Sequence, residues 1–296
     1  PRALLLFYRS MWLAGDVAPI DALCGALCAQ GLTPVPIFLT SLKDPASRGF
    51  VRAAIADIAP DIILTATAFA AGDGDDLFAP GGPPVLQVVP ATTAHAAWSE
   101  NARGLAAADL AMHVVLPELD GRVLAGAISF KDMAPLDAEL AFSAAVNRPE
   151  ADGIAQVAAR AAALVRLART PKAERRLAIL MPDYPGAPGR TGYAVGLDVP
   201  ESVRTLLETL AAEGYAVPQA PADARDLLAC LDTETAIYPL ADYAAALAAL
   251  PEATQAAIHA AWGPPEADTQ LQDGAFVFRA TRFGNALVAL APERGA

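Results

Sequence analysis

Charged side chains stand where the predicted strands of this chain end. Arg9 follows the apolar run Ala3–Tyr8, with Asp16 a few residues further on, and Lys43 follows a second apolar run, Pro34–Leu39. Open α/β sheets bind ligands outside the carboxyl ends of their strands. An arginine or a lysine at that edge can form charge-assisted hydrogen bonds with a carboxylate. The spacing therefore predicts a binding site for an acidic substrate at this edge.

The polar residues at these positions can instead cap helices or form local salt bridges. Ser41 or Asp44 can accept hydrogen bonds from the free N–H groups of the helix that follows them. Asp198 stands just before the predicted helix 201–213, and Asp16 precedes another predicted helix. A purely structural role therefore stays open for each of these side chains.

A long irregular loop follows the apolar run Leu177–Met181. It reads PDYPGAPGRTGYAVGLDV and leads into a helical pattern. Connections between a strand and a helix usually take about 2–6 residues. A much longer loop at this place indicates a ligand or a partner. Trp98 and Trp262 could stack on a flat ligand or pack in the core, and core packing is favoured.

Several common active-site motifs are absent from the sequence. There is no GxGxxG, no GxxxxGK[ST] and no GxSxG, so the sequence predicts neither a dinucleotide fingerprint, nor a P-loop, nor a nucleophile elbow. The acidic stretch Gly72–Asp76 lacks the spacing of an EF-hand and is interpreted as an exposed loop. The three histidines sit among alanines or valines and are interpreted as packed or surface residues.

The three cysteines give no metal-binding pattern. Cys24 and Cys28 lie four residues apart on a predicted helix and are interpreted as small buried residues. Cys230 and the histidines do not complete a recognisable set of metal ligands. The sequence therefore predicts no metal site and a reducing compartment, the cytoplasm.

The composition is that of a globular protein. Of 296 residues, 54% are hydrophobic and 18% are charged, with a net charge of −12. An acidic surface cannot displace counterions from phosphate, which argues against non-specific nucleic-acid binding. No apolar run approaches the roughly 20 residues of a membrane span, and no signal peptide is visible. Because the first residue is Pro1, we expect the chain to be cut from a longer one.

The first half of the sequence predicts alternating strands and helices. We expect a loop in RSMWLAGDVAP and an irregular loop or hairpin in LPELDGRVLAGAISFKD. The alternation predicts a parallel sheet with right-handed crossovers. The expected strands are Ala3–Tyr8, Pro34–Leu39, Asp61–Thr67 and Pro83–Pro90, and the expected helices are Ile20–Gln30 and Arg48–Ala59.

The pattern restarts in the second half. An alanine-rich helix at 151–169 and the charged run TPKAERR lead into it, and the expected elements are strands at Leu177–Met181, Tyr215–Val217, Phe276–Arg279 and Ala286–Leu290 and a helix at 201–213. The strand–loop–helix segments that begin the two halves arise either from an internal duplication or from two ordinary βαβ units.

The predicted fold class is α/β, with two lobes whose mainly parallel sheets are flanked by helices in flavodoxin-like or Rossmann-like βαβ units. The expected domains are residues 1–150, a helix and charged linker at 151–175, and a second α/β domain at 176–296. Because no element follows the last strand, we expect this second domain to be incomplete at its carboxyl end.

Seven segments occur in an order that resembles a known family. They are FYRSMWLAGDVAPIDAL, SLKD, VLPELDGR with ISFK, MPDYPGAPGRTGYAVGLDVPES, EGYAV, WGPP and FGNALVALAPERG, and they span Phe7 to Gly295. The set is similar to the large, substrate-binding subunits of aerobic cobaltochelatase, whose wider family includes the large subunit of magnesium chelatase. SLKD and LPELDGR resemble the cobalt branch more than the magnesium branch.

The resemblance implies a role in aerobic cobalamin biosynthesis. Large subunits of that family bind hydrogenobyrinic acid a,c-diamide, a flat polycarboxylate macrocycle, for insertion of Co(II). ATP is hydrolysed by two smaller AAA-type partner subunits, which agrees with the missing P-loop. The resemblance thus implies a cytoplasmic chelatase subunit that binds no cofactor of its own, no nucleic acid and no membrane.

The chain also departs from the family. Members are much longer and carry an HGTxE-type motif, near which metal insertion is thought to occur, after the segment that matches ALAPERGA. None of the three histidines here stands in such a motif. We therefore leave catalytic residues unassigned and expect this polypeptide to fold without inserting metal.

The resemblance also implies which residues contact the macrocycle or a neighbouring domain. Each stands in a matching segment, and they are Arg9, Asp16, Lys43, Glu118, Asp120, Arg122, Lys131, Tyr184, Arg190 and Asp198. Three alternatives stay open: a partner-docking or structural module, a protoporphyrin-binding relative of the magnesium branch, and a periplasmic-type binder, against which the missing signal peptide counts.

Overall fold

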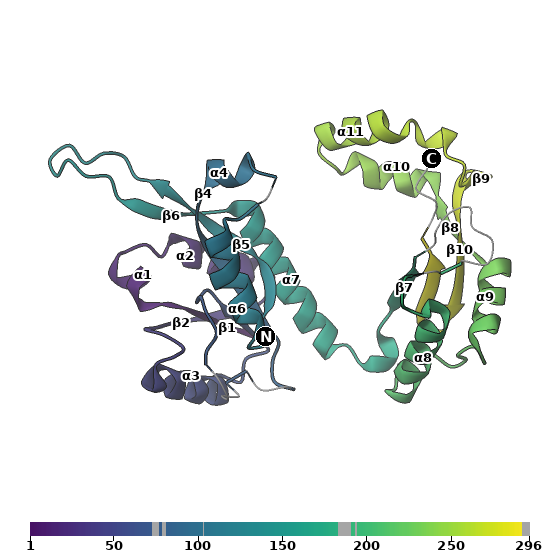
Figure 1. The fold of residues 1–296 in the computed structure, drawn as a ribbon, viewed down its shortest axis with the longest axis horizontal. Coiled ribbons are helices and arrows are strands. Elements are labelled where there is room, and N and C mark those ends of the chain that lie inside the picture. The colour runs from purple at the N-terminus through teal and green to yellow at the C-terminus, as the bar shows by residue number, and fades with distance from the viewer. Residues whose placement is uncertain (73–76, 79–80, 103, 183–190, 193, 292–296) are drawn as a thin grey trace. The chain divides into compact units, whose positions relative to one another are not determined.

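The chain forms two compact units, Pro1–Arg169 and Thr170–Ala296. Figure 1 shows the computed structural model, which describes residues 1–72, 77–78, 81–102, 104–182, 191–192 and 194–291. Each unit has its own sheet and its own buried core. The domain boundaries expected from the sequence stay a prediction.

The sheet of the first unit has six strands in the order β2-β1-β3-β4-β5-β6. All neighbours from β2 to β5 pair in parallel, and β6 pairs antiparallel with β5. The parallel α/β architecture expected from the sequence is thus confirmed. The strands are β1 (Arg2–Tyr8), β2 (Thr33–Leu39), β3 (Ile62–Thr65), β4 (Val85–Ala94), β5 (Val123–Met133) and β6 (Ala145–Pro149).

Helices cover both faces of this sheet (Figure 1). Two local predictions were wrong. Residues 9–13, expected to lie in a loop, form a short helix. The segment expected to be an irregular loop or hairpin contains the long strand β5, because β4 provides the backbone hydrogen-bonding partners for it. The helices are α1 (Arg9–Leu13), α2 (Ala18–Ala29), α3 (Pro45–Ile58), α4 (His95–Ser99), α5 (Ala107–Leu110), the π-helix Ala111–Val115, α6 (Leu116–Glu118) and α7 (Ala151–Arg169).

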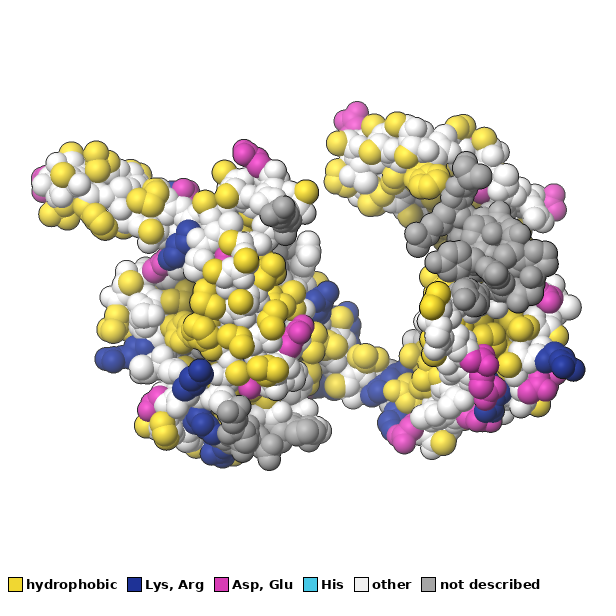
Figure 2. Space-filling model, in the orientation of Figure 1, with side chains coloured by type: hydrophobic (Ala, Val, Ile, Leu, Met, Phe, Trp, Pro, Cys, Tyr) yellow, Lys and Arg dark blue, Asp and Glu magenta, His cyan; other side chains and the backbone are white. Residues whose placement is uncertain are grey.

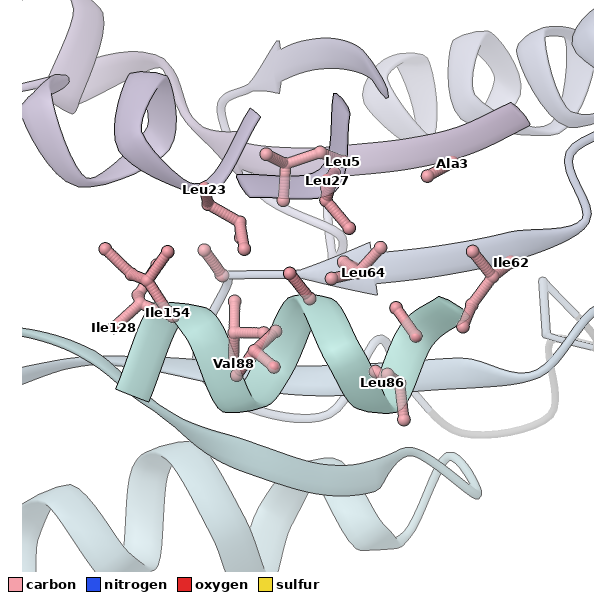
Figure 3. Close-up of a cluster of buried hydrophobic side chains, with 14 of the residues drawn as sticks. Ala3, Leu5, Leu23, Leu27, Ile62, Leu64, Leu86, Val88, Ile128 and Ile154 are labelled. Carbon is pink, nitrogen blue, oxygen red and sulfur yellow. The ribbon is translucent and has the colours of Figure 1, made fainter. Parts of the chain in front are cut away.

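Strand β1 is buried on both faces, which explains its uninterrupted apolar sequence. Leu5 packs with Leu64 and Leu23 in the core beneath α2 and α7, as Figure 3 shows. Leu4 packs on the opposite face with Val51 of α3. A central strand covered by helices on both sides holds its carboxyl end in a fixed position, and that end carries the candidate site.

A hairpin extends β5 and β6 and exposes large apolar side chains. Asp137 fastens it by accepting backbone hydrogen bonds from Glu139 and Leu140. Figure 2 shows hydrophobic side chains gathered over this hairpin. The exposed apolar residues are Met133, Leu136, Leu140 and Phe142.

The second unit has a smaller, mixed sheet in the order β7-β11-β10-β8, with β9 paired to β10. Strands β7 and β11 are parallel, and the other pairs are antiparallel. The two units therefore differ in strand order, which does not favour an internal duplication. The strands are β7 (Leu177–Met181), β8 (Thr235–Pro239), β9 (Leu271–Gln272), β10 (Ala275–Phe283) and β11 (Ala286–Leu290).

Two helices cover the core of this unit. Leu207 of α8 and Leu227 of α9 pack with Val288 of β11. The antiparallel pairing of β10 and β11 through a tight turn confirms the sequence prediction. The prediction of a strand at Tyr215–Val217 was wrong, because Val217 N–H donates back to the Tyr215 carbonyl (2.8 Å) and turns the chain. The helices are α8 (Val199–Ala212), α9 (Ala224–Thr233), α10 (Leu240–Ala248) and α11 (Glu252–Trp262).

Candidate functional site at the carboxyl edge of the first sheet

The order of the first sheet creates a reversal point at β1. The chain passes from β1 to β2 on one side and then returns to β3 on the other side. The helices that follow these strands diverge there, and this is where open α/β sheets bind ligands. The candidate site is therefore the edge formed by the carboxyl ends of β2, β1 and β3.

Tyr8 connects the end of β1 to the loop that follows β3. Its hydroxyl accepts a hydrogen bond from Ala68 N–H (3.0 Å) and donates to the Ala68 carbonyl (3.2 Å). Burial raises the pKa of Tyr8, so the hydroxyl keeps its proton and its donor role at neutral pH. Tyr8 thereby positions the loop after β3 against the end of β1.

A small cavity lies beside the hydrogen bonds between Tyr8 and Ala68. It has a volume of about 290 Å³ and lies between the loops that follow β2 and β3. The Lys43 ammonium lies 5.7 Å from the centroid of the Phe69 ring, within cation–π distance. Phe69 adopts a positive φ of 63°, and its N–H donates to the Met112 carbonyl (2.8 Å). The lining residues are Ser41, Leu42, Lys43, Ala68, Phe69 and Ala70.

Two aromatic rings stack on the surface at the same edge. Trp12 of α1 and Phe38 of β2 have centroids 5.9 Å apart and an interplanar angle of 17°. Trp12 is 58% exposed and Phe38 is 45% exposed. Arg9, at the start of α1, is exposed as well. The edge thus combines exposed aromatic faces with cationic side chains, which suits a flat acidic ligand.

Asp16 is not a helix cap. Its carboxylate accepts hydrogen bonds from the backbone N–H (2.9 Å) and the side-chain amide of Asn147, and it lies 3.6 Å from the Lys131 ammonium. Helix α2 begins at Ala18 without a side-chain cap. Asp16 and Lys131 therefore join the loop before α2 to strands β5 and β6.

Asp120 and Arg122 form a buried pair. Arg122 is fully buried and donates to the Asp120 carboxylate (2.5 Å) and to Gln87 Oε1 (3.2 Å). Asp120 also accepts from Ala71 N–H (2.7 Å). Burial lowers the pKa of Arg122, and the Asp120 carboxylate opposes that shift. Because an arginine stays charged inside proteins, this geometry gives the pair a structural role: it ties the loop after β3 to the start of β5.

The remaining predicted residues are spread over the chain. Glu118 is exposed at the end of α6. Asp198 caps α8 by accepting a hydrogen bond from Glu201 N–H (3.1 Å), which confirms the capping interpretation. Tyr184 and Arg190 lie outside the described residues.

The structure brings together three sets of the residues predicted from sequence. Arg9 and Lys43 lie at one sheet edge, while Asp16 contacts Lys131 and Asp120 contacts Arg122. The aromatic residues of the edge were missed: Trp12, Phe38 and Phe69. Trp12 and Phe38 carried a usable signal, because an aromatic residue within a few positions of a strand end lies beside the predicted site. Nothing in the sequence indicated the positive φ of Phe69.

The histidines give no metal centre. His95 Nε2 lies 3.2 Å from a Glu150 carboxylate oxygen, and its ring packs against Phe130. His113 is buried, and burial lowers its pKa, so its imidazole is neutral at pH 7. Over the described ranges, no group of three or more His, Cys, Asp or Glu side chains could hold a metal ion. No helix within those ranges has the length and hydropathy of a membrane span.

Comparison with known proteins points to one family. The family model "CobN/Magnesium Chelatase" matches residues 1–296. The chain is 38% identical to the aerobic cobaltochelatase subunit CobN of a Sinorhizobium species, covering 100% of this chain and 24% of that protein. Its identity to the CobN subunit of Pseudomonas aeruginosa is 36%, covering 100% of this chain and 25% of that protein.

More distant relatives extend the same result. The H-subunit of magnesium chelatase from Rhodobacter capsulatus is 28% identical, over 98% of this chain and 26% of that protein. The solved catalytic subunit of cobaltochelatase from Mycobacterium tuberculosis superimposes with a TM-score of 0.83 at 27% identity, covering 100% of this chain and 26% of that one. The chain spans about a quarter of the length of the relatives it matches.

Proposed function

Because the chain belongs to the CobN/magnesium chelatase family, we propose that it is part of the large subunit of an aerobic cobaltochelatase and contributes to binding of the macrocycle. The observation that carries this proposal is the family match over all 296 residues, together with 38% identity to a CobN subunit. The cationic side chains at the carboxyl edge of the first sheet support the proposal, because they can form charge-assisted hydrogen bonds with carboxylates of the macrocycle.

The proposed substrate is hydrogenobyrinic acid a,c-diamide. Its peripheral carboxylates need cationic or N–H donors, and Arg9 and Lys43 present such donors at the reversal point of the sheet. Charge-assisted hydrogen bonds of this type are about twice as strong as neutral ones. In this proposal the chain binds and orients the macrocycle, and its side chains move no proton in the reaction.

Metal insertion involves more than this chain. Co(II) is the second substrate, and AAA-type partner subunits in the cytoplasm supply the energy of ATP hydrolysis. We expect that the 296-residue chain does not insert cobalt, either by itself or together with partner subunits and ATP. Insertion monitored by the absorbance of the cobalt corrinoid tests this directly, and measurable turnover would contradict it.

The proposal is tested by titrating the chain with hydrogenobyrinic acid a,c-diamide and following the absorbance of the macrocycle. We expect saturable binding that Arg9→Ala weakens. Arg148→Ala is the control, because Arg148 is an exposed cation paired with Asp132 on the β5–β6 hairpin. If the folded chain does not bind the macrocycle, its role is to dock partners or to support the rest of the subunit.

A second candidate is the magnesium branch, in which the ligand is protoporphyrin. The 28% identity to the magnesium-chelatase relative supports it more weakly than the 38% identity to CobN supports the cobalt branch. The same titration with protoporphyrin IX separates the two candidates. We expect the corrinoid precursor to bind more tightly, and the reverse order would assign the chain to the magnesium branch.

A further inference from the structure

The stacked pair of Trp12 and Phe38 is a preformed aromatic surface. Large aromatic rings usually bury most of their area, yet both of these are substantially exposed. Phe38 is held from beneath by the buried ring of Phe7, at a centroid distance of 6.2 Å and an edge-on angle of 77°. Trp12 is carried by α1, which follows β1 directly. Because the buried Phe7 ring supports Phe38, the orientation of the aromatic pair is fixed before any ligand binds.

The cavity beside Lys43 has the dimensions of a pocket for one substituent. Its 290 Å³ lies below the range of roughly 300–1,000 Å³ that encloses a drug-sized ligand. It can therefore take one side chain of a larger molecule. The Lys43 ammonium gives the cavity a positive charge, and the Phe69 ring gives it an apolar wall.

We propose that the Trp12–Phe38 pair stacks on the face of the macrocycle while the Lys43 cavity receives one of its peripheral carboxylates. This inference rests on the proposed function and assigns the recognition elements within it. Both elements lie at the carboxyl ends of β1, β2 and β3, where the sheet order predicts a ligand. The ligand class is a conjugated ring system that carries free acid groups.

The aromatic half is tested with single variants of the 296-residue chain. Trp12→Ala is expected to raise the Kd for hydrogenobyrinic acid a,c-diamide about tenfold, in line with the stacking of flat rings on aromatic side chains. Trp12→Phe keeps a ring and should retain most of the affinity. The control is Phe142→Ala on the β5–β6 hairpin, because Phe142 is also an exposed aromatic residue (60%) and should leave the Kd unchanged.

The cationic half is tested with two forms of the ligand. Lys43→Gln is expected to weaken binding of the free acid about tenfold, the value of one charge-assisted contact, and to leave binding of its methyl ester unaffected. Lys172→Gln is the control, because Lys172 is an exposed lysine of the second unit that pairs with Glu213. Circular dichroism establishes that every variant is folded.

Each outcome decides the inference. If Trp12→Ala and Lys43→Gln both bind the macrocycle with the wild-type Kd, the aromatic and cationic assignment is overturned while the proposed function stands. Equal losses of affinity in Trp12→Ala and Phe142→Ala overturn it as well, because the effect would not be local. No binding by the wild-type chain contradicts the proposed function, and with it this assignment.

Discussion

Arg122 shows why a charged residue near a predicted ligand edge need not face the ligand. Its guanidinium is fully buried, lies 5.3 Å from the centroid of the Phe78 ring, and donates to Asp120, Gln87 and the Thr67 carbonyl. Arg9 and Lys43, which share the same charge type, lie at the sheet edge instead. Burial and hydrogen-bond partners, which residue type does not specify, separate a structural arginine such as Arg122 from an accessible one such as Arg9.

Arg122→Met is predicted to destabilise the first unit by about 3–5 kcal/mol, because it leaves the Asp120 carboxylate without its buried cation. The measurement is urea unfolding followed by circular dichroism. The control is Arg148→Met, whose side chain is 56% exposed in its pair with Asp132 and should cost less than about 1 kcal/mol. Equal losses in the two variants would contradict the structural role of Arg122.

Asp109 gives a pH-dependent prediction. Burial raises the pKa of its carboxyl, but hydrogen bonds from Thr93 and Thr92 outweigh burial and leave the pKa below the ordinary value. Both oxygens accept from the backbone N–H and hydroxyl groups of these two threonines. The charged form is thus stabilised by folding, so its contribution is present above the ordinary pKa of about 4 and is lost as the pH falls through the lower folded value.

Asp109→Asn is therefore predicted to lower the stability at pH 7 by about 1.5–3 kcal/mol, the range of hydrogen bonds to a charged group. The difference from wild type should shrink as the pH falls below about 4, because the wild-type carboxyl then becomes protonated. Denaturant unfolding at a series of pH values measures this. A difference that is constant from pH 7 to pH 3 would show that charge plays no part.

At the scale of elements, helix α7 is held against β5 by a close backbone approach. A Cβ at Gly153 would lie 1.9 Å from the Ala127 carbonyl oxygen of β5, so the position accepts only glycine. Val157 and Ile154 of the same helix are buried in the main core. The approach of the helix to the sheet therefore depends on one missing methyl group.

Gly153→Ala is predicted to destabilise the first unit by about 1–3 kcal/mol, because the added methyl must displace α7 or β5. Gly25→Ala in α2 is the matched comparison. Nothing lies within 4 Å of a Cβ at Gly25, so alanine should stabilise the helix by up to about 1 kcal/mol. The two variants should therefore shift the urea midpoint in opposite directions. Shifts of the same sign would disprove the close approach.

At the scale of the whole molecule, each unit has its own core. Leu207 is fully buried in a cluster made only of residues after Thr170, and Leu5 is buried in a cluster made only of residues before Thr170. A separate core is the condition for a unit to unfold as a cooperative transition of its own.

Leu207→Ala is predicted to destabilise the second unit by about 2–5 kcal/mol and to leave the transition of the first unit in place. Trp262 reports on the second unit, whereas Trp12 and Trp98 report on the first, so a variant that retains only Trp262 and a variant that lacks only Trp262 separate the two transitions. A parallel shift of both transitions would show that the units unfold as one.

The sequence determined the class of the fold and most of its elements. The run Ala3–Tyr8 is apolar at every position because β1 is covered on both faces, and such a run is a reliable strand signal. The ordered segments from Phe7 to Gly295 also indicated the family without any tertiary information. Strand β5 escaped the prediction, because Gly126 and the charged residues Lys131 and Asp132 interrupt its apolar sequence and its pairing with β4 is a long-range interaction.

Only the tertiary structure decided which polar residues are accessible at the candidate ligand edge. The sequence placed Arg9, Lys43 and Arg122 in the same candidate set, but burial removes Arg122 from the surface and leaves Arg9 and Lys43 at the sheet edge. It also brought Trp12 and Phe38 together from different elements. The physical reason is that local sequence fixes periodicity and caps, whereas contact between distant residues depends on how β1, β2 and β3 are ordered in the sheet.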